Sequence, residues 1–258
     1  MSLIRIAARI AAVQALKGNT LVGDNVLDSE IGALGVSADG SLRSDEEKPF
    51  ISVYTDAAKS EDNELRGFVP NGMTEFLFEA GITAAMTETD PSTDETTLIG
   101  IGIPGTDAAF EFHLDMVMRQ IGDALTDPHN EWAEIFRSFH HGNMKIERAR
   151  ASQDGSGVRL AAQQMRVSVD LITDPPARVP LPQTHKLARF FAKAEELPEL
   201  GPRLTLMKGA LAGTQYSWKT SIQRYGMTYG EADSMLLTTL EGAEADVPIA
   251  SVTGEAQI

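Results

Sequence analysis

Apolar residues at helical spacing predict three helices in the first half of the chain. Residues 3–17 and 106–125 each carry an apolar stripe that repeats every three to four residues, the spacing of a helix that packs one face against a core. The second stripe follows Thr106, a residue type that caps helix N-termini. A third helix is expected to begin at Asp127-Pro128 and to end at Gly142, because a capping residue followed by proline favours a helix start. The stripes consist of Leu3, Ile6, Ile10 and Val13, and of Phe110, Leu114, Val117, Ile121 and Leu125.

Alternation of apolar and polar residues, the period of a β-strand, predicts a sheet. It is clearest from Phe76 to Met86, where apolar side chains take every second position and leave the other face polar. Residues 50–55 are rich in β-branched and aromatic types and predict a buried strand. Short strands are expected at 25–31 and 97–103. The polar segments expected to be loops are 32–48, 56–72 and 87–96.

A hairpin and a group of prolines mark the end of a first module. Strands are predicted for 144–152 and 158–172, because these segments flank the turn sequence Gln-Asp-Gly-Ser-Gly. We therefore expect one domain over residues 1–173 and a C-terminal extension of uncertain fold over residues 174–258. The prolines that follow the hairpin are Pro175, Pro176, Pro180 and Pro182.

The extension differs from the first domain in its pattern. A helix is predicted near 185–197, where Leu187, Phe190 and Phe191 share a face. Residues 203–241 mix short apolar runs with glycine and fit either strands or helices. The tail 242–258 has small and acidic residues and is expected to be mobile.

The composition limits the class of protein. With 258 residues, of which 42% are hydrophobic and 23% charged, the chain can bury a core without metals or disulfides. It has no cysteine, which excludes thiolate metal sites and cysteine nucleophiles. No apolar run reaches the roughly 18 residues of a membrane span. Arg5 and Arg9 interrupt the apolar N-terminus where a secretory leader is continuous, so we expect a cytosolic product.

Charge is distributed unevenly along the chain. The formal net charge is −15, with −10 in residues 44–96 and +7 in residues 136–224. Binding to DNA irrespective of its sequence requires clustered Lys and Arg, so the acidic surplus argues against this function for the surface as a whole. The separation of acidic and basic segments is compatible with subunits that meet acidic face to basic face.

Glycines at 100–105 match the dinucleotide-binding pattern G-x-G-x-x-G between a predicted strand and a predicted helix. Pro104 removes one backbone donor from the turn that would hold a pyrophosphate. The following helix leads into another helix, so the second strand with its ribose-binding acid is missing. We expect a strand that ends in a capped helix, and we keep a nucleotide-dependent enzyme as the alternative.

No other motif for catalysis or metal binding stands out. His140 and His141 are neighbours, whereas a helical pair of ligands needs a spacing of four residues. His113, His129 and His185 form no ligand spacing with them, and the chain has no Gly-x-Ser-x-Gly. We therefore expect no catalytic residue, no bound metal and no cofactor, and we do not expect an enzyme.

Two groups of side chains are candidates for protein contacts. The hairpin of the first domain is rich in arginine, and no aromatic residue occurs between Phe139 and Phe190 to stack on a base. These arginines are either solvated or pair across subunits; we take them as a candidate subunit interface. The aromatic residues of the extension form either a small core or a docking surface; we take them as candidate partner contacts. The first group is Arg148, Arg150, Arg159 and Arg166, and the second is Tyr216, Trp218, Tyr225 and Tyr229.

The order of segments resembles that of a known family. An amphipathic N-terminal helix is followed by Thr-Leu-Val-Gly-Asp-Asn-Val-Leu-Asp-Ser at 20–29 and by Pro-Phe-Ile-Ser-Val-Tyr-Thr at 49–55. A long strand, two consecutive helices and the arginine-rich hairpin complete the series. Over residues 2–173 this order is similar to that of the tail terminator proteins of long-tailed bacteriophages and gene-transfer-agent-like particles, also called minor tail or head–tail joining proteins.

The resemblance implies both a fold and a function. It implies a small α+β subunit in which a mostly antiparallel sheet carries helices on one face. It further implies a structural virion protein that forms a hexameric ring, caps the tail tube and joins it to the head connector. The partners would be other copies of the chain, the tail tube protein below and a head-completion, stopper or connector protein above. DNA would pass through the lumen without specific binding, and the ring would assemble in the bacterial cytoplasm. Alternatives are another neck or tube component, such as a stopper or tube subunit.

Overall fold

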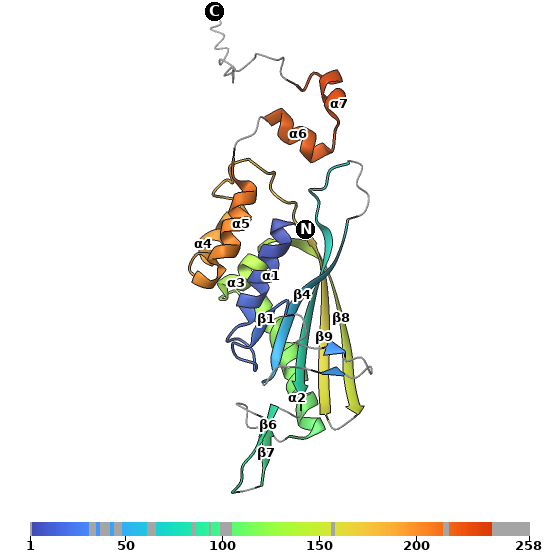
Figure 1. The fold of residues 1–258 in the computed structure, drawn as a ribbon, viewed down its shortest axis with the longest axis vertical. Coiled ribbons are helices and arrows are strands. Elements are labelled where there is room, and N and C mark those ends of the chain that lie inside the picture. The colour runs from blue at the N-terminus through green and yellow to red at the C-terminus, as the bar shows by residue number, and fades with distance from the viewer. Residues whose placement is uncertain are drawn as a thin grey trace, which may run out of the picture.

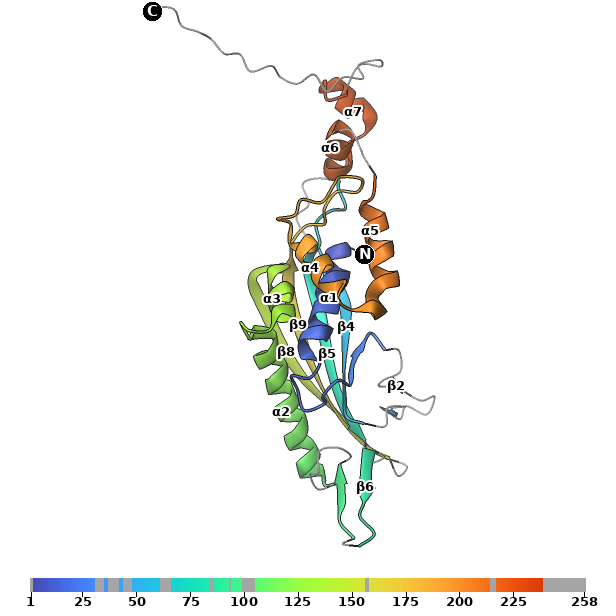
Figure 2. The same cartoon turned by 90° about the vertical axis from the view of Figure 1, so that its left-hand side faces the viewer.

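The computed structural model describes residues 2–30, 35–36, 42–43, 48–60, 66–83, 86–92, 94–98, 105–155, 158–213 and 217–238. Figures 1 and 2 show an α+β fold in which a five-stranded sheet carries helices on one face. The strand order is β1 (Val26–Asp28), β4 (Phe50–Lys59), β5 (Gly72–Thr83), β9 (Val158–Leu171) and β8 (His140–Gly155). Strand β1 pairs with β4 in parallel, and the other neighbours are antiparallel. The expected α+β class with a mostly antiparallel sheet is confirmed.

The helices and the smaller sheets complete the fold. The first domain has helices α1 (Leu3–Leu16), α2 (Asp107–Thr126) and α3 (Glu131–Ser138). The extension has α4 (Lys186–Ala194), a 3-10 turn η2 (Pro198–Leu200), α5 (Gly201–Leu211), α6 (Ser217–Tyr225) and α7 (Tyr229–Ser234). The two-stranded sheets are β2 (Gly35–Val36) with β3 (Leu42–Arg43), and β6 (Thr87–Thr89) with β7 (Thr96–Leu98). Predicted helices over 3–17 and 106–125, and predicted strands at 50–55, 144–152 and 158–172, are confirmed.

The inner face of the sheet forms one wall of the core. Phe76 lies opposite Val167 and Phe78 opposite Met165, so these side chains share one face of β5 and β9. All four are buried, and helices α1 to α3 cover them. The ring of Phe76 meets that of Phe136 on α3 edge to face, with ring centroids 5.4 Å apart. The alternating pattern of the sequence therefore gave the correct buried face.

Helix α1 is buried on more sides than its predicted stripe suggested. Leu3 and Ile6 of the stripe are only half-buried. Alanine side chains that follow them are fully buried, because α1 packs on the sheet and also contacts α2, α3 and α4 (Figure 2). Their small size lets the neighbouring elements approach closely. These alanines are Ala7, Ala8, Ala11, Ala12 and Ala15.

Polar contacts fix the N-terminus of α1. Asp174 accepts hydrogen bonds from the backbone N–H groups of Leu3 at 2.9 Å and Ile4 at 3.1 Å. Ser2 caps the same turn by accepting from the N–H of Arg5 at 3.0 Å. These N–H groups have no partner within the helix, so each cap satisfies a donor that would otherwise be buried without an acceptor. Asp174 thus ties the first helix to the segment that follows β9.

The third helix starts later than predicted. It begins at Glu131 with Asn130 as its cap, and the side chain of Asn130 accepts from the N–H of Ala133 at 3.1 Å. Asp127 instead accepts from the N–H of His129 at 2.8 Å and closes a turn. Asn130 also donates to the carbonyl of Ala15 at 2.8 Å, so contact with the end of α1 selects this cap over Asp127. The helix ends before β8 begins at His140, earlier than the predicted end at Gly142.

Three predicted loops contain strands. Strand β4 continues to Lys59 past a bulge, because Met73 and Thr74 of β5 pair with it there. Residues 87–96 contribute most of the β6–β7 hairpin, and within 32–48 the described residues form the short β2–β3 pair. Of the strand predicted at 97–103, β7 covers the start, and residues 99–103 lie outside the described residues.

The core continues across the predicted domain boundary. Phe190 of α4 is fully buried, and its ring meets those of Trp132 and Phe139 at centroid distances of 6.3 and 6.2 Å. Helix α5 adds Leu204 and Met207 to the same hydrophobic cluster. Helix α6 has no buried residue, and α7 has only Ala232. The described part of 203–241 thus contains helices and no strand, and the tail 242–258 lies outside the described residues.

Replacing Asp174 with alanine is expected to lower the free energy of unfolding by about 1–2 kcal/mol, because two N–H groups of α1 lose their acceptor. Urea denaturation followed by circular dichroism measures the change. Asp170→Ala is the matched control, since in the described part of the chain this carboxylate of β9 accepts no hydrogen bond from α1. Equal losses for the two variants would contradict the capping role.

Candidate interaction surfaces

Two of the four candidate arginines are paired within the chain. Arg150 of β8 contacts Glu111 of α2, with the Nε atom 2.7 Å and the Nη2 atom 2.5 Å from Oε1. The hydrogen bond and the charge of Glu111 raise the pKa of Arg150. Arg166 of β9 lies 3.3 Å from Asp56 and 3.4 Å from Glu75. Both arginines are partly exposed, so these ion pairs contribute little to stability.

The structure describes the side chain of only one of the other two candidate arginines. Arg148 is exposed and has no ion pair with any described residue. Arg159 lies opposite Asp154 at the end of the hairpin, and its side chain is outside the described residues. Arg148 pairs across the ladder with the inward-facing Met165, whereas Arg166 takes the next position on the opposite face. The structure therefore does not bring the four arginines together on one face.

Strand β8 forms one edge of the sheet. It pairs with β9 along its length, and no described strand pairs with its outer edge. Met144 and Ile146 are 53% and 45% exposed on the same face as Arg148 and Arg150. Exposed aliphatic side chains on a long edge strand favour pairing with another chain. Sequence patterning located this strand but gave no sign that it lies at the edge.

The described candidate aromatic residues of α6 and α7 lie at the surface and do not form a core. Trp218 and Tyr229 meet edge to face with ring centroids 6.0 Å apart. Tyr225 and Tyr229 are 43% and 59% exposed, and α6 buries no side chain. Tyr216 lies outside the described residues. The sequence left open whether these residues form a small core or a docking surface, and the exposure of the described ones fits a surface.

Two close backbone approaches hold α6 and α7 against the loop before β5. Gly226 has a φ of +63°, and a Cβ atom there would overlap the backbone of Arg66. A Cβ on Gly67 would overlap the carbonyl of Arg224. Arg66 also forms an ion pair with Glu231, whose pKa is lowered to about 2 by hydrogen bonding from the Thr228 N–H and by Arg66. Only glycine permits this contact at both positions.

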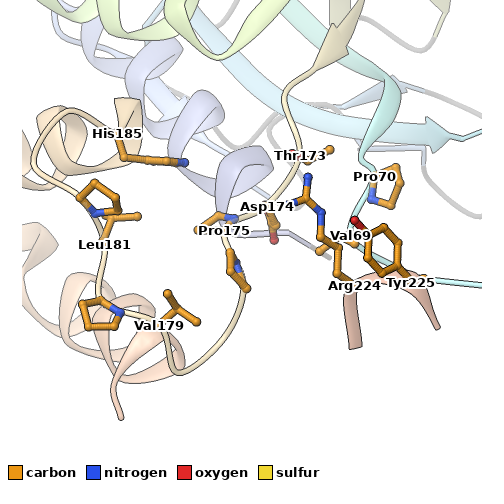
Figure 3. Close-up of a pocket in the computed structure, with 14 residues that line it drawn as sticks. Val69, Pro70, Thr173, Asp174, Pro175, Val179, Leu181, His185, Arg224 and Tyr225 are labelled. Atoms are coloured by element: carbon orange, nitrogen blue, oxygen red, sulfur yellow. The ribbon is translucent and has the colours of Figure 1, made fainter. Parts of the chain in front are cut away.

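A cavity of about 720 Å³ lies beside this contact (Figure 3). Arg224 extends toward Thr173 and Asp174 from one side. Asp174 is already engaged by the N–H groups of α1, and His185 accepts from the N–H of Leu187 at 3.1 Å. These two polar groups of the cavity therefore serve the fold, and most of the remaining lining is apolar. Its apolar lining consists of Val69, Pro70, Pro175, Pro176, Val179, Pro180, Leu181 and Pro182.

The motifs weighed for chemistry have structural roles or lie outside the described residues. Residues 99–104, with most of the glycine motif, are outside them, and the N–H of Gly105 donates to the carbonyl of Thr96 at 2.8 Å. The ring of His140 packs edge to face on Phe136. His113 of α2 is buried, which lowers its pKa. Within the described residues, no three His, Asp or Glu side chains gather as metal ligands would.

A buried acid on the outer face of the sheet escaped the sequence analysis. Glu79 of β5 is 8% exposed and accepts a hydrogen bond from Gln164 of β9 at 2.5 Å. Burial raises the pKa of Glu79, and the Gln164 hydrogen bond partly offsets this. The alternation of β5 places Glu79 on the polar face, and nothing in the sequence signals that this position is covered.

Searches against protein-family models and against curated protein sequences find no match to this chain. Among the described residues, no helix combines the length and the apolar character that a membrane crossing requires. The resemblance to tail terminator proteins therefore stays a prediction.

Replacing Gly226 with alanine is expected to free α6 and α7 from the loop at Arg66. The left-handed backbone costs an L-residue about 1–2 kcal/mol before any overlap is counted, which is about tenfold in the opening equilibrium. Limited trypsin digestion at Lys219 and Arg224 measures the open population. Gly230→Ala is the control, because a Cβ there meets no atom within 4 Å; equal cleavage of both variants would contradict the prediction.

His113 is expected to make stability depend on pH on the acid side. Because burial lowers its pKa, the unfolded chain takes up a proton at a higher pH than the folded protein does. The contribution of neutral His113 to stability is complete above pH 6.5, the pKa of histidine in the unfolded chain, and is lost as the pH falls below this value. His113→Leu should flatten the slope of unfolding free energy between about pH 7 and 5. The exposed His129→Gln should leave that slope unchanged, and an unchanged slope in His113→Leu would refute the assignment.

Proposed function

We propose that this chain is a tail terminator: a structural virion protein whose copies form a ring that caps a tail tube and joins it to the head connector. The observation that carries the proposal is the way in which the segments of the resemblance meet. Strand β1, from the 20–29 segment, lies beside β4, from the 49–55 segment. Arg9 of α1 bridges both, through Asp28 at 2.6 Å and Thr55 at 3.3 Å. The segments thus fold as one α+β unit, as the resemblance implies.

The shape of the molecule supports a role between two different neighbours. Figures 1 and 2 show an elongated subunit with the β6–β7 hairpin at one end and α6–α7 at the other. These ends differ in chemistry, since residues 87–98 carry four acidic and no basic residues, whereas the α6–α7 end exposes aromatic rings. In the proposed ring one end faces the tail tube protein and the other faces the stopper or connector. The aromatic end, with Trp218, Tyr225 and Tyr229, is the proposed partner contact.

The proposal includes the ring's surroundings. The ring is hexameric, belongs to the virion neck and assembles in the bacterial cytoplasm. DNA passes through its lumen without specific contacts, which suits a chain with a net charge of −15, since acidic surfaces repel phosphate. The proposal assigns the chain no catalytic residue and no cofactor.

Light scattering and negative-stain microscopy test the proposal. A ring that grows with protein concentration and decorates the ends of purified tail tubes is the expected result. A strict monomer that NAD or ATP stabilises against heat would support the nucleotide-binding alternative instead. A ring that binds the connector but not the tube would favour a stopper.

Reversing the charge at Arg148 is expected to weaken ring formation about tenfold or more, equivalent to about 1.4 kcal/mol per contact. Arg148→Glu is preferred to Arg150→Glu, because the latter also breaks the ion pair with Glu111 inside the subunit. Concentration series in mass photometry give the apparent dissociation constant. Lys186→Glu at the exposed start of α4 is the control, because Lys186 forms no ion pair among the described residues; if it weakens the ring as much, the effect is one of net charge alone.

A further inference from the structure

The cavity beside α6 is held open by the fold. Asp174, which lines it, caps α1 and accepts from Nδ2 of Asn71 at 3.3 Å, and its N–H donates to the carbonyl of Val69 at 3.2 Å. This part of the lining is therefore in place before any ligand binds, and a ligand that enters has little of it to order. The volume of about 720 Å³ lies within the range of ligand pockets, about 300–1,000 Å³.

The lining of the cavity favours an apolar ligand. One side is the segment 175–182, whose prolines have no N–H to donate. Val179 and Leu181 of this segment are only half-buried, and across the cavity the side chain of Tyr225 is 43% exposed (Figure 3). Apolar groups in contact with water favour a ligand that removes them from it.

One unused positive charge lies at the cavity. Arg224 is exposed, extends toward Thr173 and Asp174, and forms no ion pair with any described residue. The two carboxylate oxygens of Asp174 already accept from the N–H groups of Leu3 and Ile4. The cavity therefore suits a ligand that combines aliphatic side chains with a neighbouring carboxylate.

The chain itself contains a segment with this chemistry. Residues 239–258, which lie outside the described residues, include four acidic and no basic residues. Within them Asp246 directly precedes Val247, Pro248 and Ile249. Proline fixes one backbone dihedral in advance, so a segment that contains it has less conformational entropy to lose when it binds.

The attachment point of this segment favours docking within one copy. The N–H of Leu237 donates to the carbonyl of Ala232 at 2.9 Å, so the last described residues stay against α7. Nine extended residues from Thr238 reach about 30 Å, whereas α7 is only about 9 Å long. A short connection of this kind gives an effective concentration on the order of millimolar, so even a weak contact within one copy is occupied.

We propose that residues 247–249 occupy this cavity in the same copy, with Asp246 beside the guanidinium of Arg224 and the aliphatic side chains against Tyr225 and the proline-rich side. The cavity is then a binding site for an acidic and apolar segment of the chain's own extension. The docked segment adds a second attachment of α6 to the first domain, beside the one at Gly226. The inference does not depend on the proposed ring.

Residues 61–65 are the poorer candidate for this cavity. They are acidic, directly precede Arg66 and also lie outside the described residues. Their one aliphatic residue is Leu65, so they offer carboxylates for Arg224 but little apolar surface for the lining. The segment after α7 offers both.

Cross-linking in the full chain tests the inference, since the protein has no cysteine of its own. A variant with both Val179→Cys and Ala250→Cys is treated with a short bismaleimide. Isotope-labelled and unlabelled protein are mixed before the reaction, so that mass spectrometry distinguishes links within one copy from links between copies. The expected product joins two peptides of the same isotope. Glu88→Cys, on the hairpin at the opposite end of the molecule, replaces Val179→Cys as the control and should give no such product (Figure 1).

Charge reversal tests the part played by Arg224. Arg224→Glu is expected to lower the yield of the link about tenfold, because a carboxylate then faces Asp246. Arg148→Glu makes the same change at an exposed arginine on β8 and should leave the yield unchanged. Combining Arg224→Glu with Asp246→Arg should restore the link.

Hydrogen exchange checks the inference without any cysteine. In the unaltered protein the amides of residues 249–252 should exchange about tenfold more slowly than those of residues 253–258, and Arg224→Glu should remove the difference. Links only between copies, no link between cavity and tail, or equal exchange in both segments would overturn the inference and leave the proposed ring untouched. A monomeric protein in which the link forms within one copy supports the inference and overturns the proposed function alone.

Discussion

Helix α1 packs on the sheet and also contacts helices α2, α3 and α4, so it must be narrow on several sides. Its fully buried alanines meet this requirement, and its arginines leave the helix toward the sheet edge, where Arg5 and Arg9 reach β4 and β1. A larger side chain at Ala8 or Ala12 would push α1 away from neighbours that are packed as densely as an organic crystal. How closely α1 approaches the sheet, α3 and α4 therefore depends on its small side chains.

The same helix gives the sheet its asymmetry. By placing Arg5 on the carbonyl of Thr55, α1 blocks the β4 edge beyond the reach of β1. The β8 edge receives no such cover from any described helix. The two edges of the sheet therefore differ, one blocked and one open. A subunit with two unlike edges suits an assembly in which each copy meets the next through two different surfaces. The two ends of the molecule along its long axis also differ from each other.

The sequence predicted the parts of the fold in which one strong period governs burial. The alternation in 76–86 located β5, which runs from Gly72 to Thr83, and the stripe of α2 located the core helix, because burial alone selects those residues. The predicted start of α3 at Asp127-Pro128 was wrong. Asp127 and Asn130 look equivalent as capping residues in the sequence, and the tertiary contact of Asn130 with Ala15 decides between them. The β6–β7 hairpin was missed because its threonines and acids bury nothing, so no apolar period marks it.

The candidate surfaces were predictable in composition but not in arrangement. Arginine enrichment located the hairpin, yet strand parity places Arg148 and Arg166 on opposite faces, and Glu111 neutralises Arg150 from a helix that is distant in sequence. The exposure of Tyr225 and Tyr229 follows from the shortness of α6 and α7, which leaves too little apolar surface to form a core.

The cap of α1 by Asp174 joins residues that are 171 positions apart. During translation the first helix leaves the ribosome long before its acceptor is made, and β5, β8 and β9, which complete the wall beneath it, also come later. Contacts of such long sequence separation form slowly. The nascent chain must therefore keep an apolar helix from aggregating until about two thirds of the polypeptide exists, which makes assistance by chaperones a natural requirement for high yields of this protein.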